Sequence, residues 1–281
     1  QIGAAGRPLT KTGRYIKTLL SEYAAYKNFC SNAARKKERA NSMRAIMTAV
    51  DYADILAITL PYNRQHFDDV LIVTTPGKLD KDTRDLASQN DCRVHCTELF
   101  YSGGCPFNKF AALEQGLDIF GRHGVLCVMD ADILFPKHIP QYEIAQDTLY
   151  TPQRRMFVDV SQAVPHEPYW ASFAYPVANE EFAGYTQIFD AAALIKRMPL
   201  PWYPPTNTAG GADSVFQSRW PVANRQRPPF EVLHLGPACT NWCGRVSPYT
   251  DGSVHPEAAA RQRLLQQDRP GIEKWQQQYN C

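Results

Sequence analysis

Short apolar runs alternate with segments of helical spacing through the first half of the chain. The apolar runs at 45–50, 70–75, 93–97 and 125–129 predict strands. The segments between them predict a helix that Asp51 can cap and that ends near Pro61, then helices over 81–90 and 108–120, the last ended by Gly121. This alternation predicts an α/β fold with an open, mostly parallel sheet flanked by helices, which binds ligands at the carboxyl ends of its strands.

The pattern is less regular in the second half. Residues 136–180 are rich in proline and aromatic residues, strands are expected over 185–189 and 230–235, and a short helix over 212–220. Helices are also expected over 11–40 and 256–279. We therefore expect a helical arm (1–42), a catalytic domain (43–250, divided near residue 135 into a nucleotide-sugar half and an acceptor half) and a C-terminal helix (251–281).

Composition excludes several classes of protein. With 281 residues, 44% of them hydrophobic and 11% aromatic, the chain can bury a sizeable core and does not resemble a disordered protein. It has no apolar run long enough to span a membrane. A secretory leader is absent or was removed ahead of Gln1. Of the eight cysteines, Cys127 lies in an apolar run and Cys92 and Cys96 flank a predicted strand, and a chain of this size needs no disulfides to fold. We therefore expect reduced thiols and a cytoplasmic location, in a host cell if the source is a phage.

Charge is distributed unevenly along the chain. Residues 1–44 contain ten Lys or Arg and two acidic residues, a net charge of +8, whereas the whole chain carries +2. A basic arm on an acidic body is typical of a polyanionic partner such as DNA. The same residues can also form an ordinary solvated helix face, and both interpretations remain open.

Two carboxylates follow the most apolar predicted strand directly. Asp130 and Asp132 would point into the ligand crevice, where burial is costly unless a positive group pairs with them. A divalent cation with oxygen ligands, Mn²⁺ or Mg²⁺, meets that need and can bridge them to a diphosphate. The alternative is a surface loop with a helix cap.

The order of motifs resembles that of the GT-A nucleotide-diphospho-sugar glycosyltransferases over roughly residues 43–245. Four features carry this resemblance, and no single one is specific. They are Val50-Asp51-Tyr52 after the first strand, Asn108-Lys109-Phe110-Ala111-Ala112-Leu113, Asp130-Ala131-Asp132, and His234-Leu235-Gly236.

The resemblance implies roles for individual residues. Asp51 and Tyr52 would hold the nucleobase and ribose, Lys109 and Arg245 the donor's phosphates, and Asp130, Asp132 and His234 the metal ion. Gly210-Gly211-Ala212-Asp213 resembles an acidic segment of these enzymes in which alanine here replaces a glutamate, so only Asp213 can serve as the base on the acceptor hydroxyl. The alternatives are that Lys109 is a solvated surface residue, that His234 belongs to the core and that Asp213 caps a helix.

Two further segments are candidates for substrate contacts. The glycine turn at 101–105 can act as a flap over the donor or be a tight loop. Trp202 and Tyr203, before the Gly-Gly segment, can stack an acceptor ring or belong to the core.

The sequence therefore predicts a metal-dependent glycosyltransferase that uses a nucleotide-diphosphate sugar, with a UDP-sugar favoured. The basic arm makes a 5-hydroxymethylpyrimidine base in DNA, of the kind that phage enzymes modify, a candidate acceptor. A bacterial transferase for surface polysaccharide or lipid-linked sugars, its arm lying on an anionic membrane, is the second hypothesis. A non-catalytic nucleic-acid-binding protein is the third. The sugar, the stereochemistry and the oligomeric state stay open.

Overall fold

A computed structural model describes residues 42–176, 184–196, 198–237 and 240–267. Two sheets form its centre. The first has seven strands in the order β10-β6-β9-β4-β1-β2-β3, and the second has four in the order β5-β11-β7-β8. The strands are β1 Met43–Thr48, β2 Asp69–Thr74, β3 Arg93–Cys96, β4 Val125–Asp130, β5 Ile133–Leu134, β6 Leu149–Tyr150, β7 Gln153–Phe157, β8 Tyr175–Pro176, β9 Thr186–Asp190, β10 Arg225–Gln226 and β11 Glu231–Leu235.

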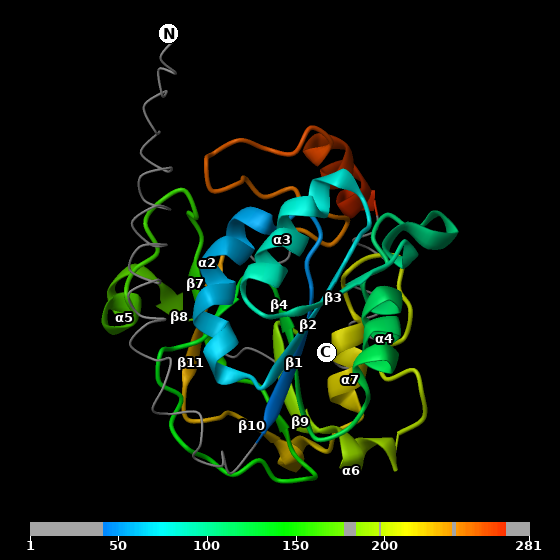
Figure 1. Cartoon of the computed structure of the whole chain (residues 1–281), viewed down its shortest axis with the longest axis vertical. Helices are drawn as coiled ribbons and strands as arrows, with labels where there is room; N and C mark the ends of the chain where they lie inside the picture. The colour runs from blue at the N-terminus through cyan, green and yellow to red at the C-terminus, as the bar shows by residue number, and fades with distance from the viewer. Residues whose placement is uncertain (1–41, 177–183, 197, 238–239, 268–281) are drawn as a thin grey trace, which may run out of the picture.

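Helices cover both faces of the large sheet (Figure 1). The α-helices are α2 Ala53–Asn63, α3 Lys81–Gln89, α4 Lys109–Phe120, α5 Trp170–Phe173, α6 Ala191–Ile195 and α7 Ala212–Ser218. The 3-10 turns are η1 Arg64–His66, η2 Lys78–Asp80, η3 Leu99–Gly104, η4 Glu167–Tyr169 and η5 Val222–Asn224. Residues 258–267 form a further helical segment, and no helix among the described residues is long and apolar enough to cross a membrane.

The large sheet confirms the predicted α/β architecture. Strand β1 pairs in parallel with β2 and β4, and β2 with β3, whereas β9 runs antiparallel to β4. Alternate residues of β1 serve opposite faces: Met43, Ala45 and Met47 pack in the core cluster under α2 and α3, and Ile46 packs under α4. Because both faces are covered, the central strands read as continuous apolar runs rather than as alternating ones.

Helix α4 shows how local sequence places the site. The Asn108 side chain caps it by accepting the Ala111 N–H at 3.1 Å, and Gly121, at φ 87°, ends it. A Cβ added at Gly116 would lie 2.5 Å from Val73, so this helix sits unusually close to the sheet. Its first residue, Lys109, is thereby fixed beside the end of β4.

Several sequence-based expectations need correction. Asp51 does not cap α2: the capping position is Tyr52, without a side-chain bond, and Asp51 adopts a φ of 60°. Pro61 lies inside α2, and α7 ends at Ser218. Strand β7 was not expected. The predicted helix 11–40 lies outside the described residues, as does 268–279, and the proposed domain boundaries stay predictions.

Arg44 does not behave as part of a basic arm. It belongs to β1, and its guanidinium donates to the carbonyl oxygens of Phe120 and Gly121, both at 2.8 Å, at the end of α4. It also lies over the Phe120 ring, 4.6 Å from the centroid. This arginine therefore caps a helix.

Candidate active site

An open pocket of about 240 Å³ lies where the carboxyl ends of β1 and β4 meet α4, α7 and the segment after β11. Most of the predicted site residues line it. Its walls comprise Thr48, Val50, Tyr52, Phe107, Lys109, Asp130, Ala131, Asp132, Arg154, Gly184, Tyr185, Ala209, Gly210, Gly211, Asp213, Ser214, His234, Pro237, Thr240, Asn241 and Trp242. Asp51 and Arg245 are not among these residues.

Asp130 and Lys109 form an ion pair at the floor of the pocket. Asp130 ends β4, and its Oδ1 accepts a hydrogen bond from Lys109 Nζ. Burial and the neighbouring charge of Asp132 raise the pKa of Asp130, although Lys109 opposes the shift. Burial would lower the pKa of Lys109, but Asp130 outweighs it and raises that pKa. Lys109 is therefore held as a cation beside the carboxylates.

Asp132 is buried with an unsatisfied oxygen. Burial alone would raise its pKa, but His234 and Lys109 hold that pKa below its ordinary value. Its Oδ2 lies 3.4 Å from His234 Nε2, and its Oδ1 has no hydrogen-bond partner among the described residues. An ionised carboxylate oxygen left without a donor in a buried position is costly, which favours a site for a cationic ligand.

Arg154 contacts the far side of the histidine. This residue of β7 was not anticipated, because its strand reads as polar. Its Nη1 donates to His234 Nδ1 at 3.1 Å, and its guanidinium lies 4.5 Å from the centre of the Tyr185 ring. A neutral imidazole that accepts at Nδ1 carries its proton on Nε2, toward Asp132. Ligation of a cation through Nε2 would require Arg154 to turn away, so His234 remains only a predicted ligand.

The carboxylates fit a divalent cation that the substrate helps to hold. Among the described residues, no three His, Cys, Asp or Glu side chains already converge as a complete ligand set. Mg²⁺ is commonly bound by one or two carboxylates together with substrate phosphate oxygens. Asp130 and Asp132, with the unpaired Oδ1 of Asp132, supply that partial set.

Asp213 lines the pocket from the first turn of α7. It is not the helix cap, since Gly211, at φ 93°, occupies that position. One of its oxygens, Oδ2, accepts the Gly184 N–H at 2.8 Å. The second oxygen is therefore the candidate proton acceptor, and the bond to Gly184 fixes the carboxylate relative to the start of β9.

Gly184 leaves room for Asp213, and we expect Gly184→Ala to be destabilising. An added Cβ would lie 2.2 Å from the Asp213 Cβ. Overpacking of this kind costs about 1–3 kcal/mol of unfolding free energy. Thermal unfolding should show the loss. Gly77→Ala is the control and should cost less, because Gly77 has an ordinary φ of −61° and an added Cβ there would lie 3.3 Å from the Thr75 hydroxyl. Equal melting temperatures for the two variants would contradict this packing.

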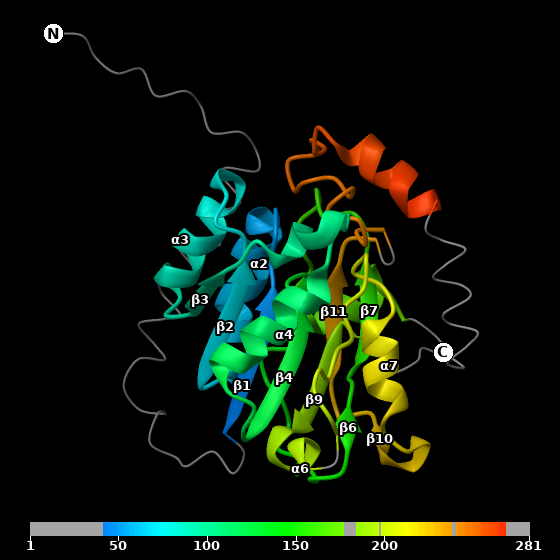
Figure 2. The ribbon, with the colours of Figure 1, turned by 90° about the vertical axis from the view of Figure 1, so that its right-hand side faces the viewer.

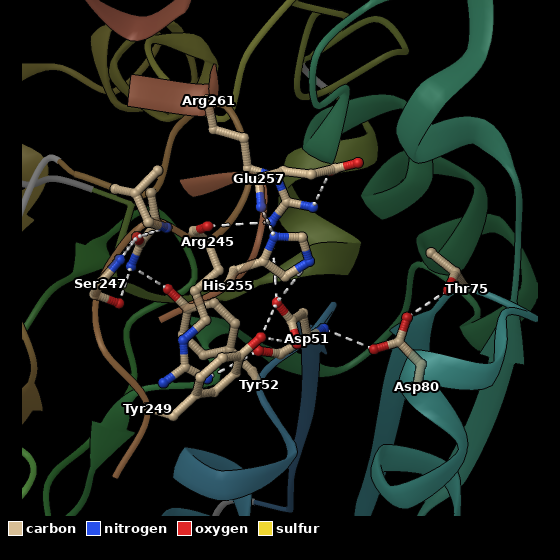
Figure 3. Close-up of polar contacts among 12 residues, drawn as sticks. Asp51, Tyr52, Thr75, Asp80, Arg245, Ser247, Tyr249, His255, Glu257 and Arg261 are labelled. Atoms are coloured by element: carbon tan, nitrogen blue, oxygen red, sulfur yellow. Dashed lines mark hydrogen bonds and ion pairs between the residues drawn. The ribbon is translucent and has the colours of Figure 1, made fainter. Parts of the chain in front are cut away.

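The carboxylate of Asp51 is held by the C-terminal part of the chain (Figure 3). Tyr249 donates its hydroxyl to Asp51 at 2.8 Å, and His255 Nε2 and Arg261 Nη1 lie 3.7 and 3.9 Å from Oδ2. The Asp51 backbone N–H donates to Asp80 Oδ1 at 2.7 Å. The predicted contact between Asp51 and the nucleotide remains untested, but these partners already occupy its side chain.

Arg245 is a buried structural cation, only 1% exposed. It makes a bidentate pair with Asp54, with Nη2 2.9 Å from Oδ2, and donates to the carbonyl oxygen of Asp51 at 2.8 Å. Its guanidinium lies between the rings of Tyr52 and Tyr249, at 4.9 and 4.3 Å from their centroids. We therefore leave it out of the proposed phosphate ligands.

We name residues 241–261 the C-terminal strap. Figure 2 shows this segment, orange to red, above the upper ends of the strands. The pocket lies at those strand ends. Besides Arg245 and Tyr249 it contains Asn241 and Trp242, two pocket residues that the sequence analysis did not single out. The strap therefore completes one wall of the pocket.

The structure does not support the two remaining predicted substrate contacts. Trp202 and Tyr203 are 0% and 1% exposed, so they belong to the core and cannot form an acceptor platform. Tyr203 stacks on Phe216, with ring centroids 4.5 Å apart. The glycine turn at 101–105 contributes none of the pocket residues, which does not support its interpretation as a flap.

The chain is similar in overall fold to solved glycosyltransferases. The mannosyltransferase of Pyrobaculum calidifontis, solved with GDP-Man and Mn²⁺, is 14% identical at a TM-score of 0.46, over 95% of this chain and 83% of that one. The mannosyl-3-phosphoglycerate synthase of Rubrobacter xylanophilus is 12% identical at 0.46, over 92% and 79%. The glucosyl-3-phosphoglycerate synthase of Mycobacterium tuberculosis, with Mn²⁺ and UDP-glucose, is 14% identical at 0.43, over 95% and 86%.

No protein-family model and no curated protein matches the sequence. Identities of 12–14% with TM-scores below 0.5 do not assign an activity. The chemistry of the pocket itself is therefore the basis for assigning a function.

Proposed function

We propose that this chain is a metal-dependent glycosyltransferase that moves a sugar from a nucleotide-diphosphate sugar to an acceptor hydroxyl. The observation that carries the proposal is the pairing of Asp130 and Asp132 at the end of β4, inside an open pocket, with an unsatisfied oxygen on Asp132. A purely structural carboxylate pair would be expected to satisfy its own oxygens. A site for a cation and a diphosphate accounts for this one.

Asp130 and Asp132 would hold Mn²⁺ or Mg²⁺, with His234 as a further predicted ligand. Such a cation supplies charge neutralisation for the diphosphate as it departs. Lys109, paired with Asp130 at the start of α4, would add a positive charge next to the same phosphates. Tyr52 lines the pocket at the end of β1, where the nucleotide is expected.

The reaction would exchange one C–O bond for another. The bond between the sugar's anomeric carbon and the diphosphate oxygen breaks, and its electron pair leaves with the diphosphate. The acceptor oxygen bonds to the anomeric carbon and loses its proton, for which the Asp213 oxygen that does not accept from Gly184 is the candidate base. In a retaining reaction Asp213 would orient the acceptor instead.

The test is a donor-hydrolysis screen with UDP-, GDP- and other nucleotide sugars in the presence of Mn²⁺. Enzymes that transfer sugars also release them slowly to water, so the nucleoside diphosphate can be measured without an acceptor. We expect release from one donor class, a UDP-sugar in the first instance, that EDTA abolishes and Mn²⁺ restores. Release that is independent of metal, or absent with every donor both alone and with acceptor mixtures, would contradict the proposal.

We further propose that the acceptor is a 5-hydroxymethylpyrimidine base in DNA. The support is the basic composition of the first 41 residues, which contain nine Lys or Arg and two acidic residues and lie outside the described structure. A basic arm can track a phosphate backbone and bring a modified base toward the pocket.

Neutralising part of the arm should weaken DNA binding. The densest run of positive charge in the arm sequence is Arg35, Lys36, Lys37 and Arg39. Replacing all four by glutamine should lower DNA affinity and reduce its salt dependence. Arg44 should be left intact because it caps α4. Titrations of hydroxymethylated DNA at several salt concentrations would measure the effect, with donor hydrolysis as the control that should not change. Flotation of the wild type with anionic liposomes, without DNA binding, would instead support the membrane-associated transferase.

A further inference from the structure

The amide of Asn241 has a fixed orientation. Its Oδ1 accepts two backbone N–H groups of the strap, from Val246 at 2.8 Å and Ser247 at 3.0 Å. Turning the amide over would place its NH₂ group against those two donors. The Nδ2 atom must therefore point the other way, where it donates to the hydroxyls of Tyr52 at 2.5 Å and Ser247 at 3.0 Å.

This orientation determines what the Tyr52 hydroxyl can do. The amide nitrogen has no lone pair to offer, so the phenolic oxygen accepts from Asn241 and its own hydrogen must point elsewhere. Within the described residues, Asn241 is the hydrogen-bond partner of this hydroxyl. Tyr52 lines the pocket together with Asp130 and Asp132, so the pocket is where an acceptor for this hydrogen can lie.

The ring itself is held in place by the strap. Arg245 lies 4.9 Å from the centre of the Tyr52 ring (Figure 3). The bidentate pair of Arg245 with Asp54 anchors that guanidinium at the start of α2. A cation over an aromatic face also makes the phenol a stronger hydrogen-bond donor. Ring and hydroxyl are thus both oriented before a ligand binds.

On this basis we propose that Tyr52 is a hydrogen-bond donor to an anionic oxygen of the bound diphosphate, and that Asn241 is the positioning residue that aims it. The inference rests on the proposed function, in which the carboxylates engage a cation and the diphosphate brings hydrogen-bond acceptors into the same pocket. A donor aimed at an oxygen that gains charge as the leaving group departs contributes to catalysis more than to binding.

Two nearly isosteric substitutions test the direction of this hydrogen bond. Tyr52→Phe keeps the ring and removes the hydroxyl. Asn241→Asp keeps the oxygen that the Val246 and Ser247 N–H groups need, but replaces the donating NH₂ group by an oxygen that would attract the Tyr52 hydrogen away from the pocket. Both variants should lower kcat for donor hydrolysis roughly 10- to 100-fold, with a smaller change in KM.

The double variant gives the decisive measurement. If Asn241 acts by aiming the Tyr52 hydroxyl, Tyr52→Phe with Asn241→Asp should be no slower than Tyr52→Phe alone. Tyr249→Phe is a matched control, because it removes a hydroxyl from the same network outside the pocket, and its kcat should stay within about two-fold of the wild type. Mn²⁺ affinity without nucleotide should be unchanged in Tyr52→Phe.

Three results would overturn the inference. The first is a Tyr52→Phe variant as active as an active wild type, and the second is additive effects in the double variant. The third is a loss of Mn²⁺ affinity in Tyr52→Phe, which would mean that the hydroxyl acts on Asp132. A wild type that hydrolyses no donor would instead contradict the proposed function. The two failures are therefore distinguishable.

Discussion

Replacing Asp132 by alanine is expected to lower metal-dependent donor hydrolysis on the order of 10³-fold, because a main electrostatic contact to the leaving group is lost. The same change should alter the unfolding free energy much less. Asp132 is buried, and against the effect of burial His234 holds its pKa low, so the carboxylate contributes some stability at neutral pH. Its other oxygen has no partner among the described residues, so the contribution to the metal-free fold is small and activity should fall far more than stability.

The measurement combines steady-state hydrolysis with thermal unfolding of the metal-free protein. Asp132→Asn, which keeps the shape but removes the charge, should lose nearly as much activity as alanine. Asp85→Ala is a suitable control, since Asp85 is an exposed helix residue that pairs with Lys81 away from the pocket, and its loss should have no effect on the rate. An Asp132→Ala enzyme that keeps more than about a tenth of its activity would mean that the carboxylate is not part of the cation site.

The second large effect is expected on stability, from Arg245→Met. This change leaves the Asp54 carboxylate without its guanidinium and removes the cation between two tyrosine rings. Breaking a buried pair by removing one partner costs about 3–5 kcal/mol of unfolding free energy. For a chain of this size that corresponds to a fall in Tm of roughly 6–20 °C.

Arg245→Lys should recover only part of the loss, because an ammonium group cannot make the bidentate pair or cover both rings. Removing both charges, in Arg245→Met with Asp54→Leu, should be less destabilising than the sum of the single variants, since no charge is then left unpaired. Additive losses would show that the two side chains do not act as a pair. Circular dichroism during heating measures all four variants, the single Asp54→Leu included.

The parts of the fold that could be predicted from sequence are those with a local signal. The central strands are continuous apolar runs because helices cover both faces of the sheet, and α4 carries its own cap at Asn108 and its own stop at Gly121. Strand β7 was missed because its first residues, Gln153, Arg154 and Arg155, are polar. Two of them serve polar partners, Arg154 on His234 and Arg155 on Glu231, rather than a core.

The candidate site was predictable to a similar extent. Asp130 and His234 lie at the ends of strands, and Asp132 lies just beyond one. Lys109 and Asp213 lie in the first turns of helices, and the structure brings all five residues to one pocket. The roles of Arg245 and Asn241 depend on partners far away in the sequence. Trp202 and Tyr203 read equally well as a platform or as core, and only packing against the sheet decides between the two.

The C-terminal strap also bears on how the protein is made. Its contacts join residues 189 positions apart between Tyr52 and Asn241, 191 apart between Asp54 and Arg245, and 198 apart between Asp51 and Tyr249. During synthesis from the N-terminus, the strands and helices of the first half can form on the ribosome well before these partners emerge. Contacts of such long range form slowly. A growing chain therefore carries the carboxylates of the pocket before it can orient Tyr52.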